Sequence, residues 1–183
     1  MRRWLGLALL LACKKETPAT AVAPAPSAST DRTTFDLETP AFLPSAAIPV
    51  EFTCDGADKS PELEWIKRPA PPLTKSFTLI VDDPDAPSGT FAHWVHFDIE
   101  PPTNTLPAGA KGVGIEGKND FGKLGWGGPC PPKGPAHRYF FRLVALDVAS
   151  LHLKEGATRA EVDAAMKGHV LAKAETMGTY QRK

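Results

Sequence analysis

Carboxylates and imidazoles stand beside apolar stretches at three separate places in this chain. Asp82, Asp83 and Asp85 follow one apolar stretch, His93 lies in a second, and His137 opens a third. An imidazole can donate a hydrogen bond and can carry charge near neutral pH, so it suits an anion such as phosphate. An ionised carboxylate can orient an imidazole by accepting a hydrogen bond from one ring nitrogen. These residue types therefore predict a small polar pocket that holds an anionic head group.

Strand periodicity indicates which of these side chains can meet. Residues 77–81 are apolar on both faces, as in a central strand, and Pro84 removes a ladder donor soon afterwards. In residues 92–99 a strict period of two puts His93 and His96 on opposite faces. We therefore expect that these two histidines cannot share a ligand.

The remaining elements complete a mainly β chain. Residues 137–147 and 171–180 are predicted strands, and weaker strand signals lie at 35–38, 50–53 and 62–66. Glycine, proline and asparagine make residues 101–134 a predicted loop. Thr158 and Glu161 form a capping box that opens the one clear helix. Many short strands with few helices predict an antiparallel β-sandwich with one or two peripheral helices.

Composition excludes several classes of function. The 183 residues carry a formal net charge of zero, which does not favour a nucleic-acid partner. The acidic residues lack the spacing of a calcium loop, and the histidine spacing does not support a zinc site. No metal or cofactor is therefore predicted. Asp82 is expected to hydrogen-bond backbone at a strand end.

The N-terminal segment resembles a targeting signal. A basic pair and a short apolar run precede Cys13 in a bacterial lipobox pattern, so residues 1–12 are predicted to be a signal peptide. The run is too short to span a bilayer, which needs about 20 residues. Residues 13–30 then form a lipidated cysteine and an Ala/Pro/Ser/Thr tether, and 31–183 the domain. We expect a lipid-anchored protein of the bacterial cell envelope, on the periplasmic face or outer membrane. An ordinary secretory signal, with Cys13 incidental, is the alternative.

Lipidation also accounts for an odd number of cysteines. The chain has three, and if Cys13 carries lipid, Cys54 and Cys130 remain in a compartment where disulfides persist. Both lie in Gly/Pro loops. A Cys54–Cys130 disulfide is therefore a hypothesis.

Several motifs in order carry a family resemblance over about residues 35–183. They are Cys54-Asp55-Gly56 with Ser60-Pro61, Asp82-Asp83-Pro84-Asp85-Ala86-Pro87, His93-Trp94-Val95, Asn119-Asp120-Phe121-Gly122, the Gly/Pro-rich residues 127–134, and His137-Arg138-Tyr139. The chain resembles the phosphatidylethanolamine-binding protein family, also called the Raf kinase inhibitor protein family. Its bacterial Raf-kinase-inhibitor-like branch is the most similar.

The resemblance implies a Greek-key β-sandwich with an anion pocket near one end. By motif position the pocket aspartate is Asp83, and the two histidines are His93 and His137. The implied rim comprises Asp85, Pro87, Gly128, Cys130, Pro131 and Tyr139. The expected ligand is an anionic small molecule or a phospholipid head group. Phe91 and Ala92 replace a tryptophan and a histidine of the animal branch.

Two other functions remain open beside the binding module. Members of the family inhibit proteases or kinases, and the pocket-edge loops are the surface that would contact such a partner. A hydrolase would use Cys130, near His137, or a metal-bound water. Cys130 lies between prolines with no helix N-terminus to lower its pKa, and no G-x-S-x-G motif is present. We therefore expect no enzymatic activity.

Overall fold

The computed structural model of the 183-residue chain describes Met1 and residues 35–183. The predicted signal peptide (1–12), the anchor at Cys13 and the tether (13–30) lie outside the described residues, as do the first four residues of the domain. No helix in the described part of the chain is long and apolar enough to cross a membrane.

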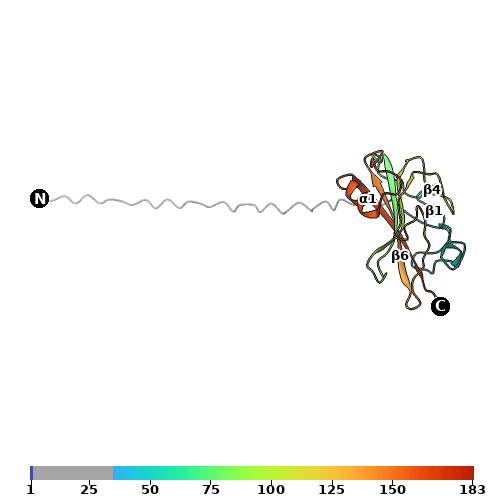
Figure 1. The fold of residues 1–183 in the computed structure, drawn as a ribbon. Coiled ribbons are helices and arrows are strands. Elements are labelled where there is room, and N and C mark those ends of the chain that lie inside the picture. The colour runs from blue at the N-terminus through green and yellow to red at the C-terminus, as the bar shows by residue number, and fades with distance from the viewer. Residues whose placement is uncertain (2–34) are drawn as a thin grey trace. The chain divides into compact units, whose positions relative to one another are not determined.

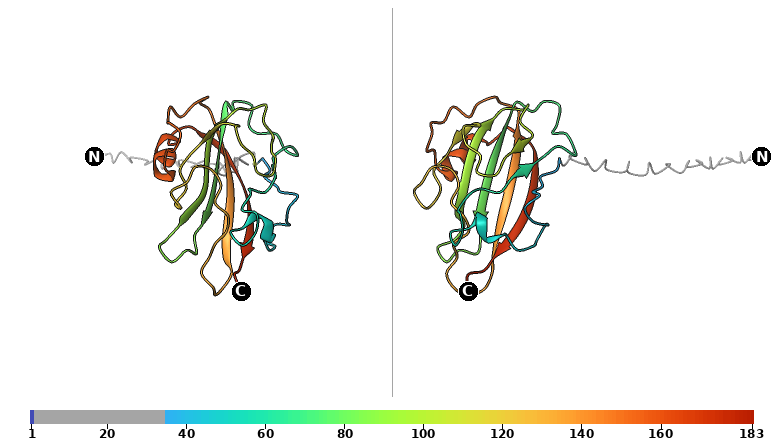
Figure 2. Two further views of the ribbon diagram at one scale, coloured as in Figure 1. Left: turned by 45° about the vertical axis from the view of Figure 1, so that its right-hand side comes forward. Right: turned by 90° about the vertical axis from the view of Figure 1, so that its right-hand side faces the viewer.

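Two antiparallel sheets make up the domain (Figures 1 and 2). The larger sheet has the order β5-β3-β2-β6-β7, with bounds β2 Ser76–Asp83, β3 Phe91–Ile99, β5 Ile115–Glu116, β6 His137–Leu146 and β7 Val170–Tyr180. The smaller one pairs β1 (Leu63–Glu64) with β4 (Thr105–Leu106). A 3-10 turn, η1 (Val50–Phe52), and a helix, α1 (Arg159–Ala165), complete the described elements. The predicted mainly β sandwich with a peripheral helix is confirmed.

The five-stranded sheet is buried on both faces. Its inner face packs on β1, β4 and the N-terminal loops through Leu79, Trp94 and Phe141, among others. Its other face packs on α1 and the loop before it through Ile80 and Val162. Figure 1 shows α1 on one side of the sheet and β1 and β4 on the other. The strand β2, apolar on both faces, lies between β3 and β6, as its composition predicts.

The strand β3 is less regular than its sequence predicts. Its pairing with β2 shifts register twice, once on each side of residues 94–96, and Asp98 has a φ of 54°. At each shift one residue is added to β3, which resets the alternation of its side chains. The ring of His93 lies 5.1 Å from that of Tyr139, and the ring of His96 lies 5.6 Å from that of Trp94, both in the inner core. The prediction that His93 and His96 face opposite sides is therefore wrong.

Two weaker strand predictions also fail. Residues 50–53 form η1 and its C-cap, Thr53, rather than a strand, because the amide and hydroxyl of Thr53 both donate to the carbonyl of Val50, at 3.0 and 2.8 Å. Such local bonds compete with a sheet ladder. Residues 35–38 contribute only an isolated bridge from Glu38 to Glu64. Conversely, the predicted loop at 101–134 contains the short strands β4 and β5.

The helix α1 begins at the predicted capping box. Glu161 accepts a hydrogen bond from the Thr158 amide at 2.7 Å, and the Thr158 hydroxyl oxygen accepts one from the Glu161 amide at 3.4 Å. Val162 is the residue of this helix that is fully buried against the sheet.

The carboxylate of Asp82 joins α1 to the sheet. It is 1% exposed, and it pairs with the guanidinium groups of Arg142, on β6, and Arg159, on α1. Its expected backbone hydrogen bond is therefore replaced by a two-arginine ion pair. The reason is that the register of β2 with β6 places Arg142 opposite Ile80, two residues before Asp82, so Arg142 reaches Asp82 diagonally across the strands, which local sequence cannot indicate.

Candidate functional site

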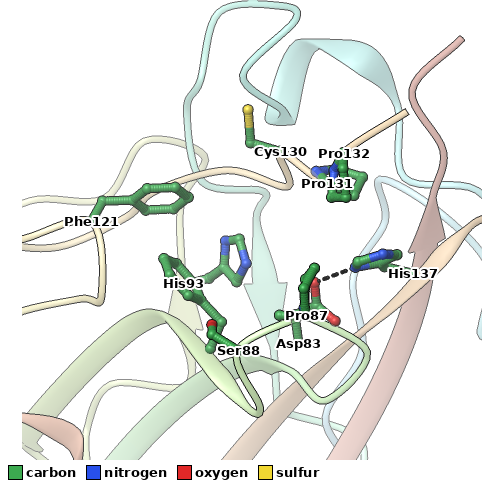
Figure 3. Close-up of a pocket in the computed structure, with 11 residues that line it drawn as sticks. Asp83, Pro87, Ser88, His93, Phe121, Cys130, Pro131, Pro132 and His137 are labelled. Atoms are coloured by element: carbon green, nitrogen blue, oxygen red, sulfur yellow. Dashed lines mark hydrogen bonds and ion pairs between the residues drawn. The ribbon is translucent and has the colours of Figure 1, made fainter. Parts of the chain in front are cut away.

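One end of the larger sheet carries a cavity of about 260 Å³ (Figure 3). Asp83 ends β2, His93 lies near the start of β3, and His137 starts β6. Because β2 is antiparallel to both neighbours, its C-terminal end lies beside the N-terminal ends of β3 and β6, so these three positions meet at the same end of the sheet. The cavity is lined by Asp83, Ala86, Pro87, Ser88, Phe91, His93, Phe121, Cys130, Pro131, Pro132 and His137.

Asp83 and His137 form a buried hydrogen-bonded pair. Nδ1 of His137 lies 2.7 Å from Oδ2 of Asp83, and the two residues are 7% and 3% exposed. The other carboxylate oxygen accepts the amide of Asp85 at 2.8 Å, which fixes the carboxylate plane. An ionised carboxylate only accepts, so Nδ1 of His137 carries the hydrogen. The remaining ring nitrogen, Nε2, is left for a ligand.

His93 is held in the same way, but by a neutral partner. Its Nδ1 lies 2.7 Å from the carbonyl oxygen of Gly127, so this nitrogen also carries the hydrogen. The rings of Phe91, Phe121 and Tyr139 surround the imidazole with centroids 5.1–5.3 Å away. Burial lowers the pKa of His93, against the opposing effect of the Gly127 carbonyl. His93 is therefore neutral at pH 7.

The predicted rim residues divide into two groups. Pro87, Cys130 and Pro131 line the cavity, whereas Asp85, Gly128 and Tyr139 do not. Each of these three has a structural contact instead. Gly128 donates its amide to Asp58 at 2.7 Å, and Tyr139 is fully buried against the ring of His93.

Asp85 is hydrogen-bonded to Arg138, the residue that follows His137. It accepts hydrogen bonds from the amide, Nε and a terminal nitrogen of Arg138, at 2.9, 2.9 and 2.7 Å. These bonds from Arg138 lower the pKa of Asp85 to about 2. The pair fixes the turn after β2 to the start of β6 at the mouth of the cavity, so Asp85 is not available to a ligand.

The sequence reasoning missed the aromatic wall of the cavity. Phe91 and Phe121 line it and contact each other with ring centroids 4.7 Å apart. The side chain of Asn119 donates to the Gly125 carbonyl at 3.0 Å and accepts the amide of Lys123 at 3.0 Å, which holds the loop that carries Phe121. Phe121 is 42% exposed. A phenylalanine in a Gly/Asn-rich loop was the available signal. Ala86, Ser88 and Pro132, also missed, lie next to predicted residues.

A disulfide joins the proline-rich wall to the loop after η1. The sulfur atoms of Cys54 and Cys130 are bonded, and the amide of Cys54 donates to the Pro129 carbonyl at 3.2 Å. A sulfur in a disulfide is not a thiolate, so Cys130 in this state is not a nucleophile. In the part of the chain that the structure describes, no three His, Cys, Asp or Glu side chains are grouped to hold a metal ion.

Acid should destabilise the fold through two buried histidines. Burial lowers the pKa of both His93 and His96 below the ordinary value of 6.5. Below pH 6.5 the unfolded chain binds protons that these rings in the folded state do not, so their contribution to stability falls as pH falls. We expect the free energy of unfolding, measured with urea, to decrease from pH 7 to pH 5. The slope should be smaller in His96→Gln and unchanged in His152→Gln, a control at an exposed position. Equal slopes in all three proteins would contradict this.

Comparisons with known proteins agree with the fold. Residues 38–181 match the family model described as phosphatidylethanolamine-binding protein. A UPF0098 protein from Aquifex aeolicus is 50% identical over 147 residues, which cover 77% of this chain and 85% of the relative. A UPF0098 protein from Methanothermobacter thermautotrophicus is 46% identical over 154 residues, 81% of this chain and 99% of the relative.

Two solved structures have the same fold. The phosphatidylethanolamine-binding protein homologue CT736 from Chlamydia trachomatis superposes with a TM-score of 0.77 at 37% identity, over 82% of this chain and 99% of that one. Escherichia coli YbcL, described as a member of the mammalian PEBP family, gives a TM-score of 0.76 at 30% identity, over 81% and 99%. With most of the domain matched in sequence and in fold, the chain belongs to the phosphatidylethanolamine-binding protein family.

Proposed function

We propose that this domain is a binding module, not an enzyme, and that its pocket holds the phosphate-like head group of a small molecule or lipid. The observation that carries this proposal is the convergence of His93 and His137, each oriented through Nδ1, on one cavity of about 260 Å³. Oriented imidazoles suit a phosphate oxygen. The size of the cavity and its walls of proline and phenylalanine leave room for an apolar group attached to the phosphate.

The proline-rich wall of the cavity argues against an acyl-transfer enzyme. Pro131 and Pro132 have no amide hydrogen, so this wall contributes few donors to an oxyanion. Cys130 is bonded to Cys54 in the disulfide, so it has no thiol that could act as a nucleophile. The same disulfide supports an oxidising compartment, in keeping with the lipid anchor expected at Cys13. On this proposal, the anchor holds the binding module at the surface of the cell envelope.

Removing the imidazole of His137 should weaken binding of a phosphate monoester. We expect His137→Ala to reduce the affinity for phenyl phosphate at pH 6 about tenfold to a hundredfold, the value of one charge-assisted hydrogen bond. Isothermal titration calorimetry measures this, with inorganic phosphate and glycerophosphoethanolamine as further probes that separate free phosphate from a lipid head group.

The chain contains a matched control for this variant. His169 also places Nδ1 on a carboxylate, that of Asp147 at 2.9 Å, but lies outside the cavity and is partly exposed. His169→Ala should bind phenyl phosphate as the unmodified protein does. If no probe binds the unmodified protein, or if the two variants bind equally well, the proposed function is wrong.

A further inference from the structure

The cavity has no permanent positive charge on its walls. None of the eleven described residues that line it is lysine or arginine, and Asp83 contributes a negative charge. The guanidinium of Arg138, the residue after His137, is paired with Asp85, and neither residue lines the cavity. The other titratable groups that face the two imidazoles are Asp120, Tyr139 and Tyr180, which are acidic or neutral. An anion that enters this cavity therefore needs a positive charge, and among the described residues that line the cavity only the imidazoles can supply it.

Each neutral imidazole already uses its one hydrogen-bond donor on a protein acceptor. His137 uses its Nδ1 hydrogen on Asp83, and His93 uses its Nδ1 hydrogen on the Gly127 carbonyl. When each ring is neutral, its free nitrogen Nε2 is an acceptor. Two acceptors and a carboxylate would repel a bare phosphate. The cavity becomes complementary to phosphate only when protons are added to it, on the rings or on the ligand.

The two rings differ in their capacity to take a second proton. On His137 the proton would create an imidazolium beside the Asp83 carboxylate, which is a compensated pair. On His93 it would create a cation whose direct partner is a carbonyl, within a ring of aromatic side chains. The second proton therefore belongs on His137. His93 stays neutral, with its Nε2 as an acceptor that the ligand must satisfy.

We propose that the pocket selects phosphomonoesters in their monoanionic form, with the P–OH of the ligand donating to Nε2 of His93 while His137 takes up a proton and donates from Nε2 to a phosphate oxygen. This inference rests on the proposed function and deepens it. A phosphodiester, the linkage in an intact phospholipid, has one negative charge but no P–OH, so it leaves His93 unsatisfied. The covalent skeleton of the ligand is unchanged in this step: the proton on His137 comes from solvent, as does the P–OH proton of a ligand that is a dianion before it binds.

Calorimetry with two ligands of equal charge tests the choice of monoester. At pH 5.5, near or below the second pKa of a phosphomonoester, which is about 6, phenyl phosphate is mostly a monoanion, and methyl phenyl phosphate is a monoanion without a P–OH. We expect the monoester to bind at least about tenfold more tightly than the diester, and His93→Phe to reduce this preference. Equal affinities of the two ligands would overturn the proposal.

Proton uptake is measured in the same experiment. Titrations of phenyl phosphate at pH 7.5 in two buffers with different ionisation enthalpies should give different apparent heats, equivalent to the uptake of one to two protons. The affinity should fall at least about tenfold between pH 5.5 and pH 7.5. Equal heats in both buffers would overturn the proposal while leaving the proposed function intact. Failure of both ligands to bind at any pH would overturn the proposed function itself.

Discussion

The free energy of unfolding of a Cys54→Ser/Cys130→Ser double variant is expected to be about 4 kcal/mol lower than that of the unmodified protein. The disulfide links residues 76 positions apart, so it removes much of the loop-closure entropy of the unfolded chain. Urea unfolding of the full chain, followed by tryptophan fluorescence, measures the loss. A reduction of this size is large against the 5–15 kcal/mol that is typical of a folded domain.

Reductant supplies the control for this variant. Dithiothreitol should lower the stability of the unmodified protein to that of the double variant and leave the variant itself unchanged. Peptide mapping after alkylation should find Cys54 and Cys130 unlabelled in the native protein. Two labelled thiols, or a loss of stability below 1 kcal/mol, would contradict the prediction.

Asp82→Ala is expected to cost about 3 kcal/mol of stability. Asp82 is almost fully buried, and its two carboxylate oxygens pair separately with Arg142 and Arg159. Removing one side of a buried ion pair leaves charge without compensation, which typically costs 3–5 kcal/mol. The lower end applies because each arginine keeps a second carboxylate, Glu175 or Asp163. Urea unfolding again gives the value.

Asp163 provides a matched control on the same arginine. It accepts from Nε of Arg159 at 2.8 Å, but its own side chain is 44% exposed. Exposed ion pairs contribute little, so Asp163→Ala should change stability by less than about 1 kcal/mol. The account of Asp82 would be wrong if the two variants were equally stable.

The elements that sequence predicts well are those fixed by local pattern. The strand β2 is apolar on both faces, and α1 carries both halves of a capping box, so neither needs a distant partner to be recognised. The strand β3 and η1 behave differently. The faces of β3 depend on two register shifts against β2, and η1 depends on hydrogen bonds of Thr53 that compete with strand pairing. These are set by contacts that a periodicity does not contain.

The candidate site divides in the same way. The three central residues, Asp83, His93 and His137, were predictable because each has a fixed place at a strand end and the family motifs mark them. The aromatic wall was not, because Phe121 reaches the cavity only through a loop tied to β3, where the amide of Gly127 donates to the His93 carbonyl at 2.9 Å. The motif places Asp85 at the ligand, but the turn after β2 brings it to Arg138, which is its structural partner.

The long-range contacts around the pocket have a consequence for folding kinetics. His137 lies opposite Tyr180 in the sheet, and the Tyr180 hydroxyl donates at 2.8 Å to Asp55, 125 positions earlier. Contacts of such long sequence separation slow the search for the native state, typically into the range of milliseconds to seconds. A chain that has already oxidised its cysteines starts this search with one long loop closed. Refolding of the oxidised chain should therefore be faster than that of the reduced one.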